Sequence, residues 1–329
     1  MSDEFLKLSV DQKRSILEGA ESQTGIKPSL LEKDIWICWI LSKLFTLPIR
    51  MAFKGGTSLS KCYGLIDRFS EDVDVTIDYR DLMADLDITK ESNSQLKKKR
   101  LALKVKVENY IIETVIPMLE QVFSEEFNNE KIHIEFEDGE KLYFNYPSVL
   151  EKNSDIYVAE NVLIEFGGTN KTEPNEIIVV KPYLTASSLV LPNANVQAYS
   201  PSRTFWEKAT LIHVECHKGK IIENPDRKSR HWHDLAKLSQ SWVKEKSLQD
   251  KELLNDALRI KKAFFNASYA NYEKCEHNEF VLIPSSEEIK QLHSDYVAMV
   301  KSGMFMNNPQ PFNQIIDQLQ QLQNEINQN

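Results

Sequence analysis

Two carboxylates one residue apart are the residues of this chain best suited to chemistry. They are Asp72 and Asp74, within Ser70-Glu71-Asp72-Val73-Asp74-Val75. Side chains alternate along a β-strand, so both aspartates lie on one face while the valines enter the core. Carboxylates held close together repel each other, and a bound divalent cation is the usual compensation. The spacing therefore predicts that Asp72 and Asp74 bind metal.

A pair of glycines precedes these carboxylates, in Lys54-Gly55-Gly56-Thr57-Ser58. Glycine lets the backbone approach a ligand closely, and the start of the helix that follows offers N–H groups and a positive dipole end to phosphate. We expect residues 54–58 to bind phosphates. Ser70, two residues before Asp72, is counted with them as a hydrogen-bonding residue of the turn. Phosphates beside metal carboxylates indicate chemistry on a nucleoside triphosphate.

A third carboxylate is expected on a neighbouring strand, because two metal ions about 3.5–4 Å apart need more ligands than two aspartates supply. Glu165, in Leu163-Ile164-Glu165-Phe166, fits best because apolar residues flank it. Glu135, in Ile134-Glu135-Phe136, remains the alternative. Either glutamate could instead occupy an ordinary solvent-facing position on an antiparallel sheet.

The first half of the chain predicts an α/β arrangement that would position these residues. Apolar spacing and turn residues predict helices over 9–22, 29–46, 57–64 and 94–126, and strands over 47–53 and 72–78. Further strands are predicted at 132–136, 142–144, 161–166 and 177–180, with Asp138-Gly139 as a hairpin turn. The residues before 190 therefore predict a mixed sheet flanked by helices.

The rest of the chain predicts helices after a linker over 192–202. Thr204 to Glu207 and Ser285 to Glu288 have the spacing of capping boxes that begin helices. The last segment carries an apolar stripe, which we interpret as a bundle-packing face rather than a partner-binding coiled coil: Phe312, Ile315, Ile316, Leu319, Leu322 and Ile326. We expect a catalytic domain over 1–195 and a helical bundle domain over 196–329.

The composition excludes several classes of protein. With 329 residues, 41% hydrophobic and 27% charged, the chain can bury a large core. The net charge of −9 argues against a protein that coats nucleic acid generally. A basic run over 97–106 is either a solvated helix face or a contact for an RNA backbone. The four separated cysteines suggest reduced thiols, and no segment predicts secretion or membrane spanning, so we expect a cytoplasmic protein.

Three separated motifs together resemble the AbiEii/AbiGii-type toxin nucleotidyltransferases, a branch of the DNA-polymerase-β-like superfamily. The first runs from Lys54-Gly55-Gly56-Thr57-Ser58-Leu59 to Arg68-Phe69-Ser70-Glu71-Asp72-Val73-Asp74. The later two are Arg203-Thr204-Phe205-Trp206-Glu207-Lys208 and Arg230-His231-Trp232-His233-Asp234-Leu235. The resemblance spans residues 30–240 and implies a nucleotidyltransferase fold.

The resemblance also implies roles for single residues. Gly55, Gly56, Thr57 and Ser58 would hold phosphates, and Asp72 and Asp74 would bind metal. Lys208 would contact the triphosphate, and Asp234 would be the functional acid of the last motif. Asp234 could either orient Lys208 or accept a proton from the attacking hydroxyl. Arg203 and Arg230 are candidate nucleotide ligands, with surface salt bridges as the alternative. The helical domain would thus contribute Lys208 and Asp234 to the cleft.

The activity implied is transfer of a nucleoside monophosphate from a nucleoside triphosphate to an acceptor hydroxyl, with Mg²⁺ or Mn²⁺ as two bound ions. An RNA end such as that of tRNA is the acceptor we expect. The protein would be the toxin of a toxin–antitoxin or phage-defence (abortive infection) pair, with a cognate antitoxin as partner. The alternatives are a glycosyltransferase that uses Asp-x-Asp, and a non-catalytic nucleotide- or partner-binding module of the same fold. A zinc site built on His213 and Cys216 is disfavoured, since no second ligand pair follows.

Overall fold

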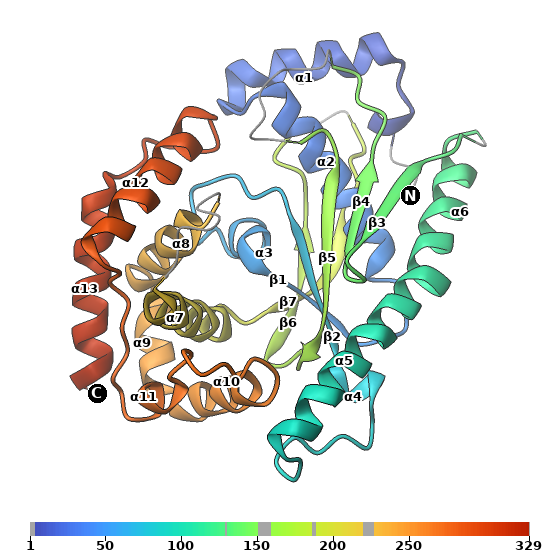
Figure 1. Cartoon of the computed structure of the whole chain (residues 1–329). Helices are drawn as coiled ribbons and strands as arrows, with labels where there is room; N and C mark the ends of the chain where they lie inside the picture. The colour runs from blue at the N-terminus through green and yellow to red at the C-terminus, as the bar shows by residue number, and fades with distance from the viewer. Residues whose placement is uncertain (1–3, 129, 151–158, 186–188, 220–226, 329) are drawn as a thin grey trace. The chain divides into compact units, whose positions relative to one another are not determined.

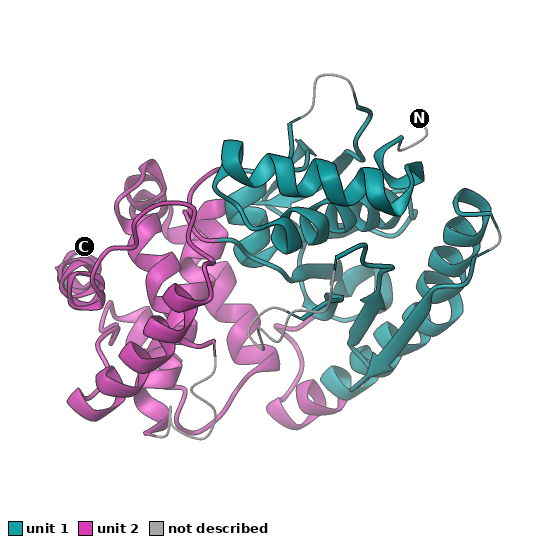
Figure 2. Cartoon of the chain, turned by 90° about the horizontal axis from the view of Figure 1, so that it is seen from above, with its two compact units in different colours: residues 1–62, 69–86, 99–199 teal, residues 63–68, 87–98, 200–329 magenta. Residues whose placement is uncertain are grey.

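Segments far apart in sequence assemble into two units in the computed structural model (Figure 1), which describes residues 4–128, 130–150, 159–185, 189–219 and 227–328. Unit 1 comprises residues 1–62, 69–86 and 99–199 and is teal in Figure 2. Unit 2 comprises residues 63–68, 87–98 and 200–329 and is magenta. Each unit therefore draws on more than one stretch of the chain.

Unit 1 is built on a mixed sheet, which contains seven strands among the described residues, in the order β3-β4-β5-β2-β1-β7-β6. The strands are β1 (Met51–Lys54), β2 (Val73–Asp78), β3 (His133–Glu137), β4 (Lys141–Asn145), β5 (Val162–Asn170), β6 (Asn175–Val180) and β7 (Ala194–Tyr199). β2 lies antiparallel to β1 and parallel to β5, while β1 lies parallel to β7. Asp138 and Gly139 both have positive φ between β3 and β4, which confirms the predicted hairpin turn.

One face of the sheet holds the core of unit 1. Val73, Val75 and Ile77 of β2 are fully buried on it, as the alternation along the strand predicts. Helix α2 (Pro28–Leu44) packs against β5 and β7, and the rings of its Trp36 and Trp39 lie tilted against Phe144 of β4. The opposite face carries the side chains at alternate positions, including Asp74.

The long helix predicted over 94–126 is confirmed, as α5 (Asn93–Tyr110), a π-helical turn (Ile111–Val115) and α6 (Ile116–Glu126). Pro117 lies in the first turn of α6. Because proline has no N–H, it interrupts the regular hydrogen bonds, which accounts for a π-turn at this point. Residues 99–126 of this long helix belong to unit 1, which also contains a short 3₁₀ helix (Phe5–Lys7), α1 (Val10–Thr24), α3 (Gly55–Lys61) and α4 (Tyr79–Leu82).

The predicted linker over 192–202 is wrong, because its residues 194–199 form strand β7 between β1 and β6. Val196 and Ala198 are fully buried, while the intervening Asn195 is exposed and Gln197 is half-buried. The polar residues that suggest a linker are therefore the outward positions of an ordinary alternating strand.

Unit 2 is helical. Its helices are α7 (Pro201–Lys218), α8 (Ser229–Ser239), α9 (Trp242–Gln249), α10 (Lys251–Phe264), α11 (Tyr272–Glu276), α12 (Ser286–Lys301) and α13 (Phe312–Gln328). The predicted box at Thr204 is wrong, since α7 already begins at Pro201, a residue suited to the first helical position. The box of Ser285 and Glu288 is confirmed at the start of α12.

The apolar stripe of α13 faces the inside of unit 2, as predicted for a bundle helix. Ile315, Leu319 and Leu322 are buried, and α13 packs against α8. Its Gln323 and Asn327 also accept hydrogen bonds from the backbone of Leu282 and Phe280. Within the described residues, no helix is long and apolar enough to cross a membrane. The four cysteines, all described, are free.

Candidate functional site

The glycine turn of unit 1 brings the backbone against a carboxylate. Lys54 ends β1 in an extended conformation, and Gly55 follows with φ of +77° at the start of α3. A Cβ atom added to Gly55 would lie 1.9 Å from Oδ2 of Asp74. Only glycine fits this position, because any side chain would both strain the backbone and displace the Asp74 carboxylate.

Strand register places the expected charged residues in one row. Asp74 of β2 is paired with Lys54 of β1 on one side and with Glu165 of β5 on the other. Paired residues of neighbouring strands point to the same face and lie about 5 Å apart. Asp72 precedes β2 on the same alternation as Asp74 and is 5% exposed. That the two aspartates share a face stays a prediction, because β2 begins at Val73, one residue after Asp72.

The two candidate third carboxylates differ in their distance from this row. Glu165 is the direct neighbour of Asp74. Glu135 lies on β3, which is separated from β2 by β4 and β5, and its side chain is exposed. At about 4.8 Å per strand, Glu135 is about 14 Å from the aspartate strand. The register favours Glu165 as the third carboxylate.

The other predicted phosphate residues are mostly enclosed. Thr57 is fully buried and donates a hydrogen bond to the Asp72 carbonyl at 2.6 Å. The Ser58 hydroxyl is buried and has no hydrogen-bond partner among the described residues. Ser70 is 7% exposed. Gly56 is buried, whereas Lys54 and Gly55 keep part of their surface exposed. The accessible part of the turn is therefore at its start, next to Asp74.

Carboxylate oxygens are the ligands that Mg²⁺ prefers, which makes Asp72, Asp74 and Glu165 chemically suitable. Across the part of the chain that the structure describes, no three His, Cys, Asp or Glu side chains are grouped to enclose a metal by themselves. Mg²⁺ does not require such a cage, because it is usually held by one or two carboxylates together with water and substrate phosphates. These carboxylates, together with the buried Ser58 hydroxyl of α3, are a donor set that fits a metal-bound triphosphate.

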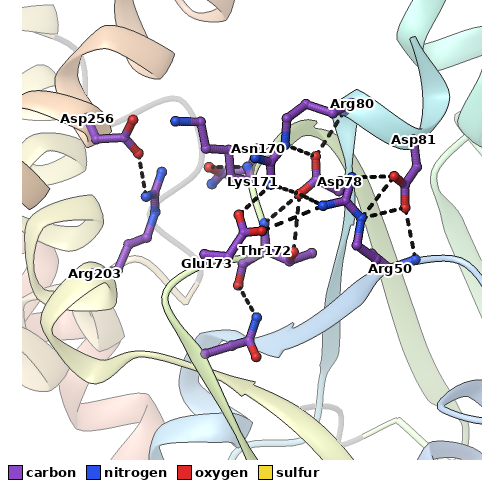
Figure 3. A network of polar contacts seen from close by, with 11 residues as sticks. Arg50, Asp78, Arg80, Asp81, Asn170, Lys171, Thr172, Glu173, Arg203 and Asp256 are labelled. Carbon is purple, nitrogen blue, oxygen red and sulfur yellow. Dashed lines mark hydrogen bonds and ion pairs between the residues drawn. The ribbon is translucent and has the colours of Figure 1, made fainter. Parts of the chain in front are cut away.

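The far end of β2 is fixed by a polar network, drawn in Figure 3. The buried Asp78 carboxylate accepts hydrogen bonds from the Arg80 guanidinium at 2.7 Å and the Thr172 N–H at 3.2 Å. Glu173 forms ion pairs with Arg80 and Arg50. Burial alone would raise the pKa of Asp78, but the hydrogen bonds from Arg80 and Thr172 lower it to about 2. The network anchors β2 at the end opposite to Asp72.

In unit 2, Lys208 and Asp234 are in direct contact. Lys208 on α7 donates a hydrogen bond to Oδ2 of Asp234 on α8 at 2.9 Å. Arg68 binds the same carboxylate in a bidentate manner, at 2.8 Å to each oxygen. His233 lies 3.2 Å from Oδ1. Asp234 is therefore the centre of a buried ion-pair network.

The electrostatics of this network decide between the two roles considered for Asp234. Burial would raise the pKa of Asp234, but Arg68 and Lys208 hold it well below its usual value. A carboxylate with a strongly lowered pKa is a poor proton acceptor. The geometry thus favours the role in which Asp234 orients Lys208.

The two arginines considered as nucleotide ligands lie in unit 2. Arg203, on α7, has a buried side chain that pairs with Asp256 at 2.6 Å (Figure 3) and approaches Glu207 at 3.7 Å. Arg230 is half-buried on α8. Burial is the main reason why the pKa of His231 lies well below its usual value, and the positive charges of Lys208 and Arg230 lower it further. Arg203 serves the internal structure of unit 2, and Arg230 remains the more accessible candidate.

A zinc site at His213 is not supported. Its Nδ1 accepts a hydrogen bond from the Val281 N–H at 3.0 Å, and its Nε2 lies 3.2 Å from the Asn271 carbonyl. Both ring nitrogens are thus occupied by backbone groups. Burial lowers the pKa of His213 to about 4, so the ring is neutral.

Comparison with known proteins identifies the family. The family model described as "Nucleotidyl transferase AbiEii toxin, Type IV TA system" matches residues 39–318. The chain belongs to this family. A similar solved structure is that of MenT4, a nucleotidyltransferase toxin from Mycobacterium tuberculosis H37Rv, with 13% identity, a TM-score of 0.40 and coverage of 98% of this chain and 97% of that chain. No curated protein matches the sequence.

Membership of the AbiEii family confirms the predicted family and the prediction of a nucleotidyltransferase toxin, and the seven-stranded sheet confirms the mixed α/β fold class. The family adds that the toxin–antitoxin system is of type IV. In this AbiEii chain, however, some contacts of the site residues were not predicted. Arg68, which binds Asp234, lies within the first motif without an assigned role. Lys33 and Asp34 on α2 contact segments next to Asp72 and Gly55. The sequence signal for these contacts is the run of three charged residues, 32–34, in the mainly apolar helix α2.

Proposed function

We propose that this AbiEii toxin transfers a nucleoside monophosphate from a nucleoside triphosphate to an acceptor hydroxyl, with Mg²⁺ or Mn²⁺ bound. The observation that carries the proposal is the row of Lys54, Asp74 and Glu165 beside the Gly55 turn. It combines oxygen ligands for a cation with a backbone that accepts no side chain. Both features serve a metal-bound polyphosphate.

The residues of this chain would act mainly by positioning. Asp72, Asp74 and Glu165 would hold two ions, which neutralise triphosphate charge and activate the acceptor hydroxyl when bound. Residues 54–58 would orient the phosphates. Lys208, held by Asp234, would offset the charge that develops on the leaving pyrophosphate, since a compact ammonium suits that task. Little covalent chemistry by the protein is required.

We further propose an RNA end, such as that of tRNA, as the acceptor. The basic run on α5 supports this choice, because its Lys97, Lys98, Arg100, Lys104 and Lys106 are exposed. Exposed cations along one helix can bind a phosphate backbone even in a protein of net charge −9. Because nucleoside triphosphates and tRNA are cytoplasmic, the reaction would take place in the cytoplasm. The partner protein would be a cognate antitoxin, and the pair would act in phage defence.

The test is transfer of label. The protein is incubated with each α-labelled nucleoside triphosphate, Mg²⁺ and total RNA, and label on RNA is followed on gels. We expect label with one or more triphosphates, its loss with EDTA, and its loss in Asp72→Ala and Asp74→Ala. Label on RNA that persists in both aspartate variants would contradict the proposed metal site.

A matched pair of variants tests the third carboxylate. Glu165→Gln and Glu135→Gln make the same chemical change on the same face of the sheet, one next to Asp74 and the other three strands away. We expect Glu165→Gln to reduce transfer at least 100-fold and Glu135→Gln to leave it unchanged. The opposite result would assign the third carboxylate to Glu135.

A further inference from the structure

Helix α2 carries three consecutive buried charges, which is unusual in a helix that is otherwise apolar. Glu32, Lys33 and Asp34 are 4%, 2% and 1% exposed. Buried charges are kept where each has a partner. Here each side chain binds a different segment of unit 1, and two of those segments belong to the candidate site.

Lys33 binds the residue before Asp72. Its Nζ donates a hydrogen bond to Oε2 of Glu71 at 2.7 Å and to the Ala159 carbonyl at 3.0 Å. The side chains of Lys33 and Glu71 are both almost fully buried. The contact therefore fixes the backbone where the aspartate strand begins.

Asp34 binds the helix that begins at Gly55. Its Oδ1 pairs with Lys61, the last residue of α3, and its Oδ2 accepts a hydrogen bond from the Tyr183 N–H at 2.6 Å. The Lys61 ammonium also lies 4.0 Å from the Tyr183 ring centroid. This second contact fixes α3, whose first residue packs against Asp74.

The two contacts form a closed circuit. It runs from Lys33 to Glu71 and Asp72, from the Asp72 carbonyl to Thr57 on α3, and from Lys61 back to Asp34. Because Lys33 and Asp34 are adjacent on a helix packed against the sheet, the circuit ties both site segments to one rigid element. We propose that Lys33 and Asp34 are positioning residues that set the distance between the glycine turn and the metal carboxylates, an inference that rests on the proposed function.

Glu32 supplies the comparison that separates positioning from stability. It lies on the same helix with the same degree of burial, but it accepts hydrogen bonds from Ser148 at 2.7 Å and the Val149 N–H at 2.8 Å. Neither residue touches the candidate site. A merely structural role for buried charges on α2 would make Glu32 equivalent to Lys33.

The experiment measures Mn²⁺ affinity in the full chain, by electron paramagnetic resonance of free Mn²⁺ without nucleotide, together with thermal unfolding. The test variants remove both charges of one pair at nearly constant volume: Lys33→Met with Glu71→Gln, and Asp34→Asn with Lys61→Met. The control is Glu32→Gln, and Asp74→Ala reports the metal site itself. Lys33→Arg, which keeps the charge but changes the contact geometry, serves if a double variant does not fold.

We expect each double variant to bind Mn²⁺ 10- to 100-fold more weakly, the usual effect of removing groups that orient metal ligands. Label transfer, measured in the same variants, should fall as well. Glu32→Gln should bind Mn²⁺ within twofold of the unaltered protein. If the double variants bind Mn²⁺ normally and Asp74→Ala does not, the positioning role is wrong and the metal site of the proposed function stands. If Asp74→Ala also binds normally, the metal site of the proposed function is wrong.

Discussion

At Gly55 a single missing Cβ atom decides whether the Asp74 carboxylate can occupy its place. We expect Gly55→Ala to reduce transfer by about 100-fold, because displacing a reacting group by about 1 Å has effects of that size. It should also destabilise the fold by about 1–3 kcal/mol, through the positive φ and the close contact. Label transfer and thermal unfolding measure the two effects.

Gly25 provides the control for backbone strain. It has φ of +69°, yet an added Cβ would meet nothing within 4 Å. Gly25→Ala should therefore cost about 1–2 kcal/mol of stability and leave transfer unchanged. Equal losses of activity in the two variants would show that strain, rather than the Asp74 contact, explains the Gly55 effect.

Lys208 and Asp234 should separate function from stability. After Lys208→Met, Asp234 keeps its bidentate bonds from Arg68, so we expect a stability loss of only about 1–2 kcal/mol and a large loss of transfer. Asp234→Asn leaves two buried cations without a counter-charge and should cost about 3–5 kcal/mol. Chemical denaturation of both variants checks the order. A stable Asp234→Asn protein would contradict its role as the hub of the network.

Among elements, the crossing of α5 over β5 depends on Gly168. A Cβ there would lie 2.3 Å from Cγ2 of Val107 on α5 and 2.8 Å from Cδ1 of Leu82. We expect Gly168→Ala to destabilise the protein by about 1–3 kcal/mol, because the helix must move away from the strand. The unfolding midpoint in urea measures it.

The neighbouring Gly167 is the matched control, since an added Cβ would meet nothing within 4 Å. Gly167→Ala should change stability by less than about 1 kcal/mol. A similar loss in both variants would mean that flexibility of the strand, and not the helix crossing, is responsible.

Most elements could be predicted because their signals are local. The alternation around Asp74 identifies β2, and the spacing of Ser285 and Glu288 identifies the start of α12. The strand β7 could not be predicted, because Pro192 and Pro201 flank it and its hydrogen-bonding partners, β1 and β6, are set by tertiary structure. The residues of the candidate site also fall into a predictable and an unpredictable group. Its carboxylates are visible in sequence, whereas the contacts of Lys33 and Arg68 depend on folding.

For the whole molecule, acid stability should depend on His213. The pKa of His213 is about 4 in the folded protein and about 6.5 when unfolded. Between these values the unfolded chain binds the extra proton, so stability is full above pH 6.5 and falls as the pH drops toward 4. We expect His213→Gln to remove about 3 kcal/mol of this pH dependence, since one pKa unit corresponds to about 1.4 kcal/mol. Unfolding free energies measured from pH 4 to 7 test it.

His133, whose side chain is 73% exposed, is the control. His133→Gln should leave the pH profile unchanged. If His213→Gln keeps the full slope, the neutral ring with two backbone hydrogen bonds does not explain the acid sensitivity. The carboxylates held by arginine, such as Asp78, lose their protective charge only at lower pH, near 2.

The interleaving of the two units is also a property of the whole molecule. Residues 63–68 and 87–98 belong with the helices that follow residue 200. The bond between Arg68 and Asp234 is one reason, because it joins residues that are 166 positions apart in the sequence.

The parallel pairing of β1 with β7 has a consequence for how the protein is made. Phe53 lies beside Ala198, so β1 gains its second neighbour only after the ribosome has translated most of unit 1. Such distant pairings form slowly and late. Lys208 and Asp234 emerge later still. If both residues have the roles proposed for them, a growing polypeptide cannot transfer a nucleotide before Asp234 has been translated.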